Sequence, residues 1–468
     1  MSNRQESKAL RMGCTIGYGI GAIGEGIGYN VFFSFFSFFL TTVAGIPPAV
    51  AGVISSVAVL WDAVTDPMIG SWSDTTRNPK GRRRPFIMTG SVLFGVSIAM
   101  VFFNFDIPVG LKTVYFILAN GFYWIALTSC VIPHISLGSE LTDDFNERTK
   151  LRSCAVTLMG IGTLIATSST LLLVKFYQGV FGSESAGWAA TGITFGVIVA
   201  LVYHLCCFAV KNLEPANPNL AEPARKKPWK ETLAIFLRSA KRAFQNKALS
   251  LLIVVNFSYN VFVTLSSGLL VYVLSYVFVY DEAQTSMVYL VQGILVILTA
   301  ILAGYVANKT DKKTVMTGSM LLTIIACLII GFLPSKSVWL YMYVVIYALG
   351  NSGFWTMIYA MSYDSAILEQ IETGKKPDGL YTSLIGLFMK FGNALGTLIM
   401  GFGLQLIGFS SESETQTEAT VQGIKLLFGI APSIVILVGL IAAIAYPLTK
   451  AKYIELQGVL KAKENAGR

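Results

Sequence analysis

The chain has 468 residues, of which 54% are hydrophobic and only 13% are charged, and its mean hydropathy is +0.63. Soluble domains carry roughly 25% charged residues, so this composition excludes a soluble globular protein. The formal net charge of +9 could indicate a nucleic-acid partner. Whether it does depends on how the cations are distributed along the chain.

Apolar runs long enough to cross a bilayer, about 20 residues each, recur along the whole chain. Uninterrupted runs of this length favour helices over a β-barrel, whose strands alternate over about ten residues. The sequence therefore predicts an all-α membrane protein with twelve transmembrane helices. The predicted spans are 13–42, 48–74, 85–104, 112–140, 152–177, 187–210, 248–279, 284–307, 314–333, 337–366, 380–409 and 421–447.

Lysine and arginine residues are distributed unevenly between the two sides of this topology. With the N-terminus in the cytoplasm, 30 of the 35 cations fall in inner segments and 4 in outer loops, and the remaining one, Lys390, lies deep in the eleventh span. This positive-inside pattern predicts a multi-pass protein of the cell (inner) membrane with both termini cytoplasmic. The positive charge is therefore assigned to orientation and to the lipid bilayer, not to nucleic acid. We expect a monomer.

A polar connector divides the spans into two groups of six. The predicted parts are 1–210 (N-terminal half), 211–247 (cytoplasmic connector), 248–449 (C-terminal half) and 450–468 (cytoplasmic tail). Within the connector, Trp229–Phe244 carries an apolar stripe that fits either an interfacial amphipathic helix or a solvated linker helix.

The two halves repeat a loop pattern after their second helix. The first loop is GSWSDTTRNPKGRRR from Gly70, and the second is GYVANKTDKKT from Gly304. In each, an Asp or Asn follows the glycine by four residues and a cluster of cations comes next. Two six-helix halves related by an internal repeat resemble the major facilitator architecture, in which a solute site lies near the bilayer midplane.

Charged side chains at bilayer depth cost roughly 2.5–3.5 kcal/mol each and usually mark ion paths, solute sites or paired charges. Asp62 and Asp66 are four residues apart, so they share one face of the second span, with Thr65 beside them. Such an oxygen cage suits a small metal cation. The alternatives are that one carboxylate carries a proton, because like charges in a low dielectric resist joint ionisation, or that the pair only balances Lys390.

The other charges at depth are candidates for solute contact or gating. Lys390 needs a negative partner, for which the Asp62/Asp66 pair is the natural choice, and Gly392 and Gly396 next to it allow close helix approach. Glu25, within GIGAIGEGIG, could contact the solute, take a proton or hydrogen-bond a neighbouring helix. Asp364 is a candidate for a gating ion pair.

Aromatic side chains are the remaining candidates for solute contact. Trp124, Trp355 and Tyr359 offer ring faces that suit a sugar, with core packing as the alternative. Catalytic motifs are missing from the sequence: it has no GxxxxGK loop and two histidines, fewer than a metal-dependent hydrolase would need. We therefore expect no enzyme activity and no cofactor, only a transported coupling ion, Na+ or H+.

Several segments resemble the glycoside–pentoside–hexuronide:cation symporters of the major facilitator superfamily. They are YGIGAIGEG, WDAVTDPMIGSWSDTTRNPKGRRRP, IPHISLGSELTDDFNERTKL, GFWTMIYAMSYD and KKPDGLYTSLIGLFMKFGNALGTLIMGFGLQLIGF. They occur in family order through both halves, so the combination is specific.

The resemblance implies roles for individual residues. Asp62, Asp66 and Thr128 match cation ligands of the family, and Thr65 stands in place of an asparagine ligand. Lys390 matches a lysine that links the cation and solute sites, and Trp355 matches a sugar-contacting tryptophan. The gating candidates of this architecture are Asp74, Arg83, Arg148 and Asp364.

The departures from the family concern the solute. Members that carry melibiose hold the galactoside with two aspartates, and those positions are Gly26 and Val131 here. An arginine and a tryptophan of their site match Val156 and Ile135, and Glu25 replaces a lysine.

The coupling residues are thus retained while the galactoside ligands are absent. We expect symport of a monovalent cation with a small organic solute of sugar or glycoside type by alternating access. A uniporter, or a transporter of a more apolar, amphiphilic solute on the same fold, is the alternative.

Overall fold

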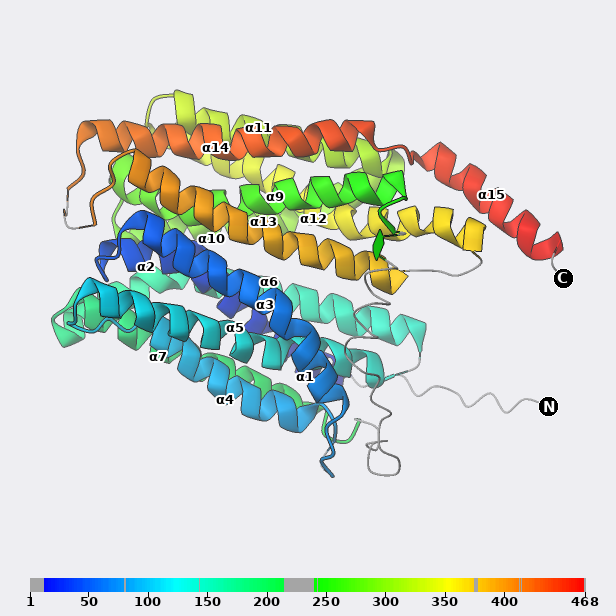
Figure 1. The fold of residues 1–468 in the computed structure, drawn as a ribbon, viewed down its shortest axis with the longest axis horizontal. Helices are drawn as coiled ribbons and strands as arrows, with labels where there is room; N and C mark the ends of the chain where they lie inside the picture. The colour runs from blue at the N-terminus through cyan, green and yellow to red at the C-terminus, as the bar shows by residue number, and fades with distance from the viewer. Residues whose placement is uncertain are drawn as a thin grey trace. The chain divides into compact units, whose positions relative to one another are not determined.

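A computed structural model describes residues 12–79, 81–142, 144–213, 240–241, 243–373, 378–411, 413 and 415–466. Within these residues, twelve helices are long and apolar enough to cross a membrane (Figure 1). The expected twelve-helix membrane architecture is therefore confirmed. Most of the connector 211–247, including most of the predicted helix Trp229–Phe244, lies outside the described residues.

The chain forms two compact units, of which the first contains six spans and also takes in Tyr280–Leu290. Its first span consists of α1 (Met12–Val31), a π-helical turn η1 (Phe32–Phe36) and α2 (Ser37–Thr42). The other spans are α3 (Pro48–Asp74), α4 (Arg84–Val101), α5 (Val109–Glu140), α6 (Phe145–Phe181) and α7 (Glu184–Ala209). Prolines stand in the first turns of α3 and α4, where the missing N–H costs no helical hydrogen bond.

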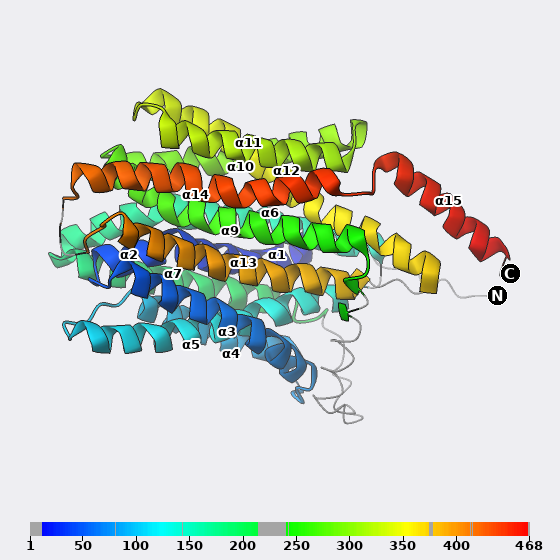
Figure 2. The ribbon, with the colours of Figure 1, turned by 45° about the horizontal axis from the view of Figure 1, so that its top comes forward.

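The second unit repeats this plan and adds a terminal helix. Its spans are α9 (Lys247–Tyr272) with the π-helical turn η3 (Val273–Val277), α10 (Glu282–Lys309), α11 (Lys312–Phe332), α12 (Ser337–Thr373), α13 (Asp378–Leu406) and α14 (Glu418–Ala445). Helices α9, α13 and α14 run side by side, and α15 (Lys450–Ala466) extends past the end of α14 (Figures 1 and 2). Asn246, Asp311 and Thr417 cap α9, α11 and α14 with their side chains.

Close glycine contacts fall at equivalent places in the two units. The third and sixth helices meet backbone to backbone at Gly95 and Gly196 in the first unit and at Gly331 and Gly429 in the second. The first and fifth helices meet at Gly162 and at Gly392, respectively, each facing a backbone oxygen of the opposite helix. Small residues allow this approach because no side chain separates the helices. The internal repeat predicted from the loops thus extends to helix packing.

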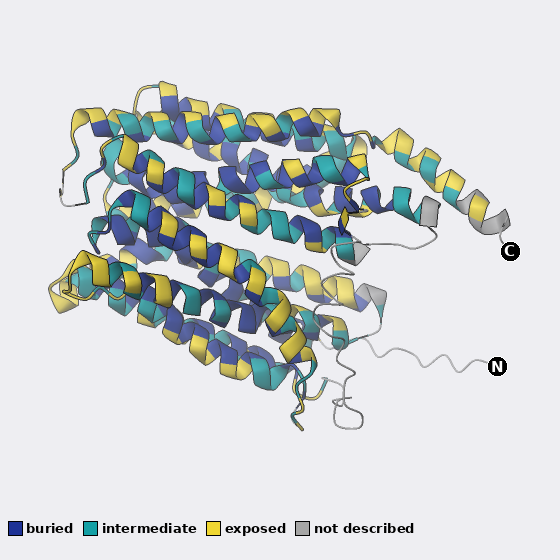
Figure 3. Ribbon diagram, in the orientation of Figure 1, coloured by how far each residue is buried: buried dark blue, intermediate teal, exposed yellow. Residues whose placement is uncertain are grey.

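Burial alternates along each helix, so most spans carry a packed face and an exposed apolar face (Figure 3). The spans differ from the predicted ones mainly at the ends. The fifth begins at Glu147 instead of 152, and the tenth ends at Ile371 instead of 366. Hydropathy marks the lipid-facing part of a helix, whereas the hydrogen-bonded helix continues into the polar region on the inner side.

Candidate cation and solute site

A carboxylate pair on α3 shares one hydroxyl from α5 in the first unit. Asp62 is 1% exposed, and Asp66 is half-buried one turn later. The Oγ1 of Thr128 lies 2.6 Å from Asp62 Oδ1 and 2.8 Å from Asp66 Oδ1. Thr65 is also buried, but its hydroxyl donates to the backbone oxygen of Asp62 at 3.3 Å. The structure thus brings these four candidates together, while their role as cation ligands stays a prediction.

The three side chains bring oxygen atoms close together. A threonine hydroxyl has one proton to donate, and an ionised carboxylate only accepts. Two carboxylate oxygens at 2.6 and 2.8 Å from one hydroxyl form a group that a proton or a small cation would stabilise. Carboxylate and hydroxyl oxygens are the ligand type that hard cations prefer.

Trp124 lies in an aromatic cluster beside the carboxylate pair. It is 1% exposed, and its ring packs edge-on against Phe32 at 5.1 Å and Tyr29 at 5.8 Å between ring centroids. Tyr29 in turn lies within electrostatic range of Asp62 and Glu25. The aromatic side chains therefore form a packed layer next to the charges, and solute contact by Trp124 stays a prediction.

Glu25 occupies a tightly packed part of α1 and is 9% exposed. A Cβ atom on the next residue, Gly26, would lie 2.2 Å from the Met159 backbone oxygen of α6. A carboxylate at position 26, as in the melibiose-carrying members, is therefore sterically excluded from this packing. Gly26 is therefore one of the residues that permit the close approach of α1 and α6.

A charge cluster joins the C-terminal ends of α3 and α5 to the N-terminal end of α4. Arg83 is 5% exposed, forms an ion pair with Asp74, and donates from Nε to Glu140 Oε1 at 3.0 Å. Its Nη1 donates to Ser73 Oγ at 2.7 Å, and Arg82 contacts the same Glu140 oxygen at 2.6 Å. Two gating candidates, Asp74 and Arg83, are thus in direct contact.

Arg148, the third gating candidate, makes a different contact. It is exposed near the start of α6, and its Nε donates to the Thr142 backbone oxygen at 2.7 Å. This bond holds the turn that leads into α6.

The second unit holds a counterpart of this cluster around the start of α11. Lys312, at the start of α11, contacts Asp364 Oδ2 of α12 at 2.6 Å. The Oδ1 of Asp311 accepts from the Lys313 backbone N–H at 3.0 Å, and its Oδ2 accepts from the Lys450 N–H of α15 at 2.9 Å. One carboxylate therefore caps two helices next to the ion pair, and α15 is fixed to the end of α11.

The solute candidates of the second unit lie on α12 and α13. Trp355 is half-buried and its ring stands edge-on to Tyr259 at 6.4 Å, while Tyr359, one turn later, is 37% exposed. Lys390 is half-buried on α13, next to the glycine contact with α9. Lys390 belongs to the second unit and the aspartates to the first, and their pairing stays a prediction.

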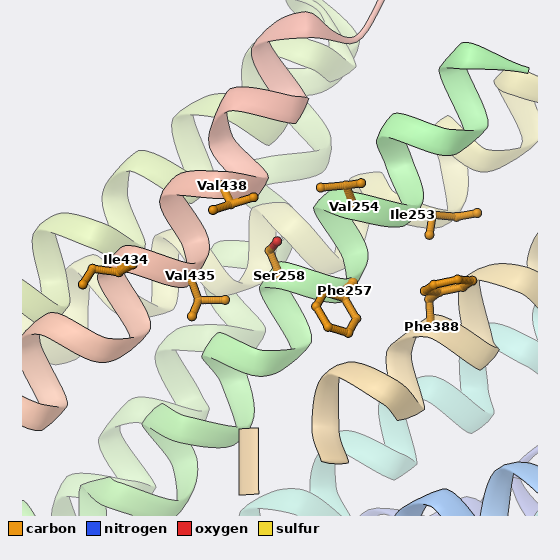
Figure 4. A pocket seen from close by; sticks show the side chains of 8 residues that line it. All are labelled: Ile253, Val254, Phe257, Ser258, Phe388, Ile434, Val435 and Val438. Atoms are coloured by element: carbon orange, nitrogen blue, oxygen red, sulfur yellow. The ribbon is translucent and has the colours of Figure 1, made fainter. Parts of the chain in front are cut away.

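An apolar pocket of about 420 Å³ opens between α9, α13 and α14 (Figure 4). Its lining includes Phe257, Phe388 and Val438, with the Ser258 hydroxyl as a polar group. It contains no charged side chain, so it is distinct in chemistry from the carboxylate pair.

Three residues of these clusters escaped the sequence analysis: Glu140, Lys312 and Arg152. Glu140 and Lys312 lie at the inner ends of predicted helices, where a charge is expected for orientation alone. Arg152 lies within electrostatic range of Glu25. Glu140 and Lys312 could have been found by counting opposite charges at the predicted inner ends of the helices. Arg152 could not have been found in this way, because its position depends on which face of α6 packs against α1.

The fold and these clusters define a polytopic transporter of the major facilitator type. The chain matches the family model of the MFS/sugar transport proteins over residues 17–450, and it belongs to this family. It is 25% identical to an uncharacterized symporter of Synechocystis sp., over 99% of both chains.

Two further comparisons agree with this membership. The chain is 25% identical to a glucuronide carrier protein homolog of Escherichia coli, over 94% of this chain and 93% of the relative. The xylose transporter XylE from E. coli in an inward open conformation has the same fold, with a TM-score of 0.63, 14% identity and coverage of 95% and 98%. The chain is therefore a secondary membrane transporter and not an enzyme.

Proposed function

We propose that this protein is a symporter that couples entry of a monovalent cation, Na+ or H+, to uptake of a sugar or glycoside-type solute by alternating access. The observation that carries the proposal is the carboxylate pair whose Oδ1 atoms lie 2.6 and 2.8 Å from the one hydroxyl of Thr128, an oxygen group of the type that binds hard cations. The symporter and glucuronide carrier names of its relatives support the same type of transport.

The membrane supplies the energy for such coupling. One elementary charge crossing the membrane is worth about 2.3 kcal/mol per 100 mV, enough to concentrate a neutral solute more than tenfold. Asp62 and Asp66 would bind the cation in one state of the transporter and release it in the other. The ion pairs Arg83–Asp74 and Lys312–Asp364 lie at the inner helix ends, where breaking and re-forming contacts would accompany the transition.

The test is thermal unfolding of the purified protein in Na+ and in choline buffers at several pH values, with a panel of sugars. A sodium symporter is expected to be stabilised by Na+, and further by its solute only when Na+ is present, because bound ligands stabilise the state that binds them. For a proton symporter, we expect the thermal stabilisation to depend on pH instead of on Na+.

Two matched substitutions give the test its control. Asp62→Asn removes a buried charge of the pair and is expected to abolish stabilisation by the cation. Asp106→Asn makes the same chemical change at an exposed outer-loop residue and is expected to behave as wild type. Cation-dependent stabilisation that survives in Asp62→Asn would overturn the assignment of the site.

A further inference from the structure

The apolar pocket between α9, α13 and α14 is open on one side. Val254, Ile434 and Val438 line it and are between 39% and 60% exposed. Ile253 and Ser258, which also line it, are at most 3% exposed. Buried residues therefore form the floor of the pocket and exposed apolar residues form its rim (Figure 4). In a protein that spans a membrane, such an apolar rim faces the acyl chains of lipids.

The depth of the pocket along the helices corresponds to one leaflet of the bilayer. Along α9 its lining runs from Ile253 to Ser258, which are six and eleven residues after the first residue, Lys247. At a rise of 1.5 Å per residue, these positions are about 9 and 16 Å from that end of the helix. Phe388 is ten residues after the start of α13, and Val438 is seven residues before the end of α14, at a similar depth (Figure 1). Half of a hydrocarbon core is about 15 Å thick, so the acyl chain of a lipid in the near leaflet reaches the pocket.

Glycine contacts hold α13 and α14 against α9 at this level. A Cβ atom at Gly392 would lie 2.7 Å from the Phe257 backbone oxygen, and one at Gly439 would lie 2.9 Å from the Ser258 Cβ. Phe257 and Ser258 both line the pocket, so close helix contacts fix its floor. Its volume of about 420 Å³ falls within the range of ligand sites, about 300–1,000 Å³.

An aromatic contact connects the pocket to a cationic segment at the predicted inner end of α9. The ring of Phe388 packs edge-on against Phe244 at 5.9 Å between ring centroids, and Phe244 is exposed. Lys241 and Lys247 stand three residues before and after Phe244, and both are exposed. Neither lysine forms an ion pair within the described segments. The two ammonium groups are therefore available to a ligand that reaches the pocket from this end.

The composition of the segment matches a negatively charged headgroup. Residues 238–250 contain four cations and no acid. Basic clusters directly beside the inner end of a transmembrane helix attract anionic lipid headgroups. The pocket itself is lined by apolar side chains and the single hydroxyl of Ser258, so it suits a hydrocarbon chain and not a polyhydroxylated solute, whose hydroxyl groups would lack partners there.

We propose that this pocket binds one acyl chain of an anionic phospholipid, whose phosphate group is held by Lys241 and Lys247. The site lies within the second unit and goes beyond the proposed transport function, which does not depend on it. The bound chain stabilises the packing of α9, α13 and α14, because it supplies contacts to side chains that otherwise line an unfilled space. The negative headgroup provides the lysines with the counter-charge.

The test is native mass spectrometry of the full-length protein in detergent, titrated with dioleoylphosphatidylglycerol or dioleoylphosphatidylcholine. The wild type is expected to bind one phosphatidylglycerol about tenfold more tightly than phosphatidylcholine, with a rise in melting temperature. Glycerol 1-phosphate and dioleoylglycerol supply the headgroup and the chains separately, and each is expected to bind at least about tenfold more weakly than the whole lipid. Equal binding of the two phospholipids, or of either fragment and the whole lipid, overturns the proposal.

Two tryptophan substitutions assign the acyl chain to the pocket. Ile434→Trp places a larger side chain in the pocket and is expected to lower the affinity for phosphatidylglycerol about tenfold or more. The exposure of this position allows the larger side chain without disturbing the core. Ile301→Trp makes the same change at an exposed isoleucine of α10 outside the pocket and should bind as wild type. The proposal fails if the two variants bind the lipid alike, or if Ile434→Trp alters only the oligomeric mass, which would make the pocket an interface between copies.

Two double variants assign the headgroup to the lysines. Lys241→Gln/Lys247→Gln is expected to reduce the affinity for phosphatidylglycerol to that for phosphatidylcholine. Lys309→Gln/Lys452→Gln removes the same charge from exposed residues elsewhere in the second unit and should keep the preference. An equal loss of preference in both double variants would show a general effect of net charge and refute the assignment. A preference that survives in both would refute it as well.

Discussion

At the scale of single residues, the shared hydroxyl is the feature that gives the carboxylate pair its chemistry. Thr128→Val keeps the shape of the side chain but removes the hydroxyl that contacts both Asp62 and Asp66. Hydrogen bonds to charged groups are worth about 1.5–3 kcal/mol, so we expect cation affinity to fall by roughly 10- to 100-fold. The measurement is the Na+ or proton concentration that gives half of the maximal rise in melting temperature.

Two neighbouring substitutions serve as controls for this prediction. Thr128→Ser keeps the hydroxyl and is expected to bind the cation nearly as wild type. Ser129→Ala removes a hydroxyl that donates to its own helix at Ile125 and should leave cation affinity unchanged. Equal affinity in Thr128→Val and wild type would show that the hydroxyl takes no part.

At the scale of helices, the contact between α1 and α6 depends on glycine. A Cβ atom at Gly162 would lie 2.3 Å from the Ile23 backbone oxygen, whereas one at Gly160 would meet nothing within 4 Å. We expect Gly162→Ala to destabilise the protein by about 1–3 kcal/mol through overpacking. Gly160→Ala, two residues away, should be neutral or slightly stabilising, since alanine favours helix. Thermal unfolding of the two variants side by side checks this, and similar melting temperatures would count against the packing.

The inner charge cluster gives a second prediction at this scale. Glu140→Gln removes a charge that holds both Arg82 and the buried Arg83. We expect a loss of about 1–3 kcal/mol in unfolding free energy, because the buried Arg83 loses one of its charged partners. Lys452→Gln breaks an exposed ion pair with Glu455 and should leave the melting temperature unchanged, since such pairs contribute little. A Glu140→Gln variant as stable as wild type would mean that Arg83 is hydrated and not held by the cluster.

At the scale of the whole molecule, the uneven charge distribution predicts orientation. Because 30 of the 35 cations fall in segments on one side, the positive-inside rule predicts that Lys336 lies outside and Gln245 inside. The six native cysteines are buried or half-buried, so new exposed thiols can be labelled selectively. An impermeant maleimide should label Lys336→Cys in intact cells and Gln245→Cys only after permeabilisation. The reverse result would invert the topology.

Helix number and the carboxylate spacing could be predicted from the sequence because both are local properties. Hydropathy identifies each span, and four residues always place two side chains on one helix face. Sequence reasoning was less able to identify the residues on other helices that contact these carboxylates and charges. Thr128 was named through a resemblance to a family, whereas Glu140 and Lys312 were not named at all. Which side chains meet across helices depends on crossing points and rotation, and these are encoded in contacts between residues far apart in the chain.

The sequence by itself therefore determined the twelve spans and the location of the acids within them, since lipid imposes its demands on each segment separately. Only the tertiary structure decided that one hydroxyl serves two carboxylates and that Gly26 has no room for a side chain. These features arise where α1, α3, α5 and α6 pack together, and close packing fixes distances that no single helix specifies.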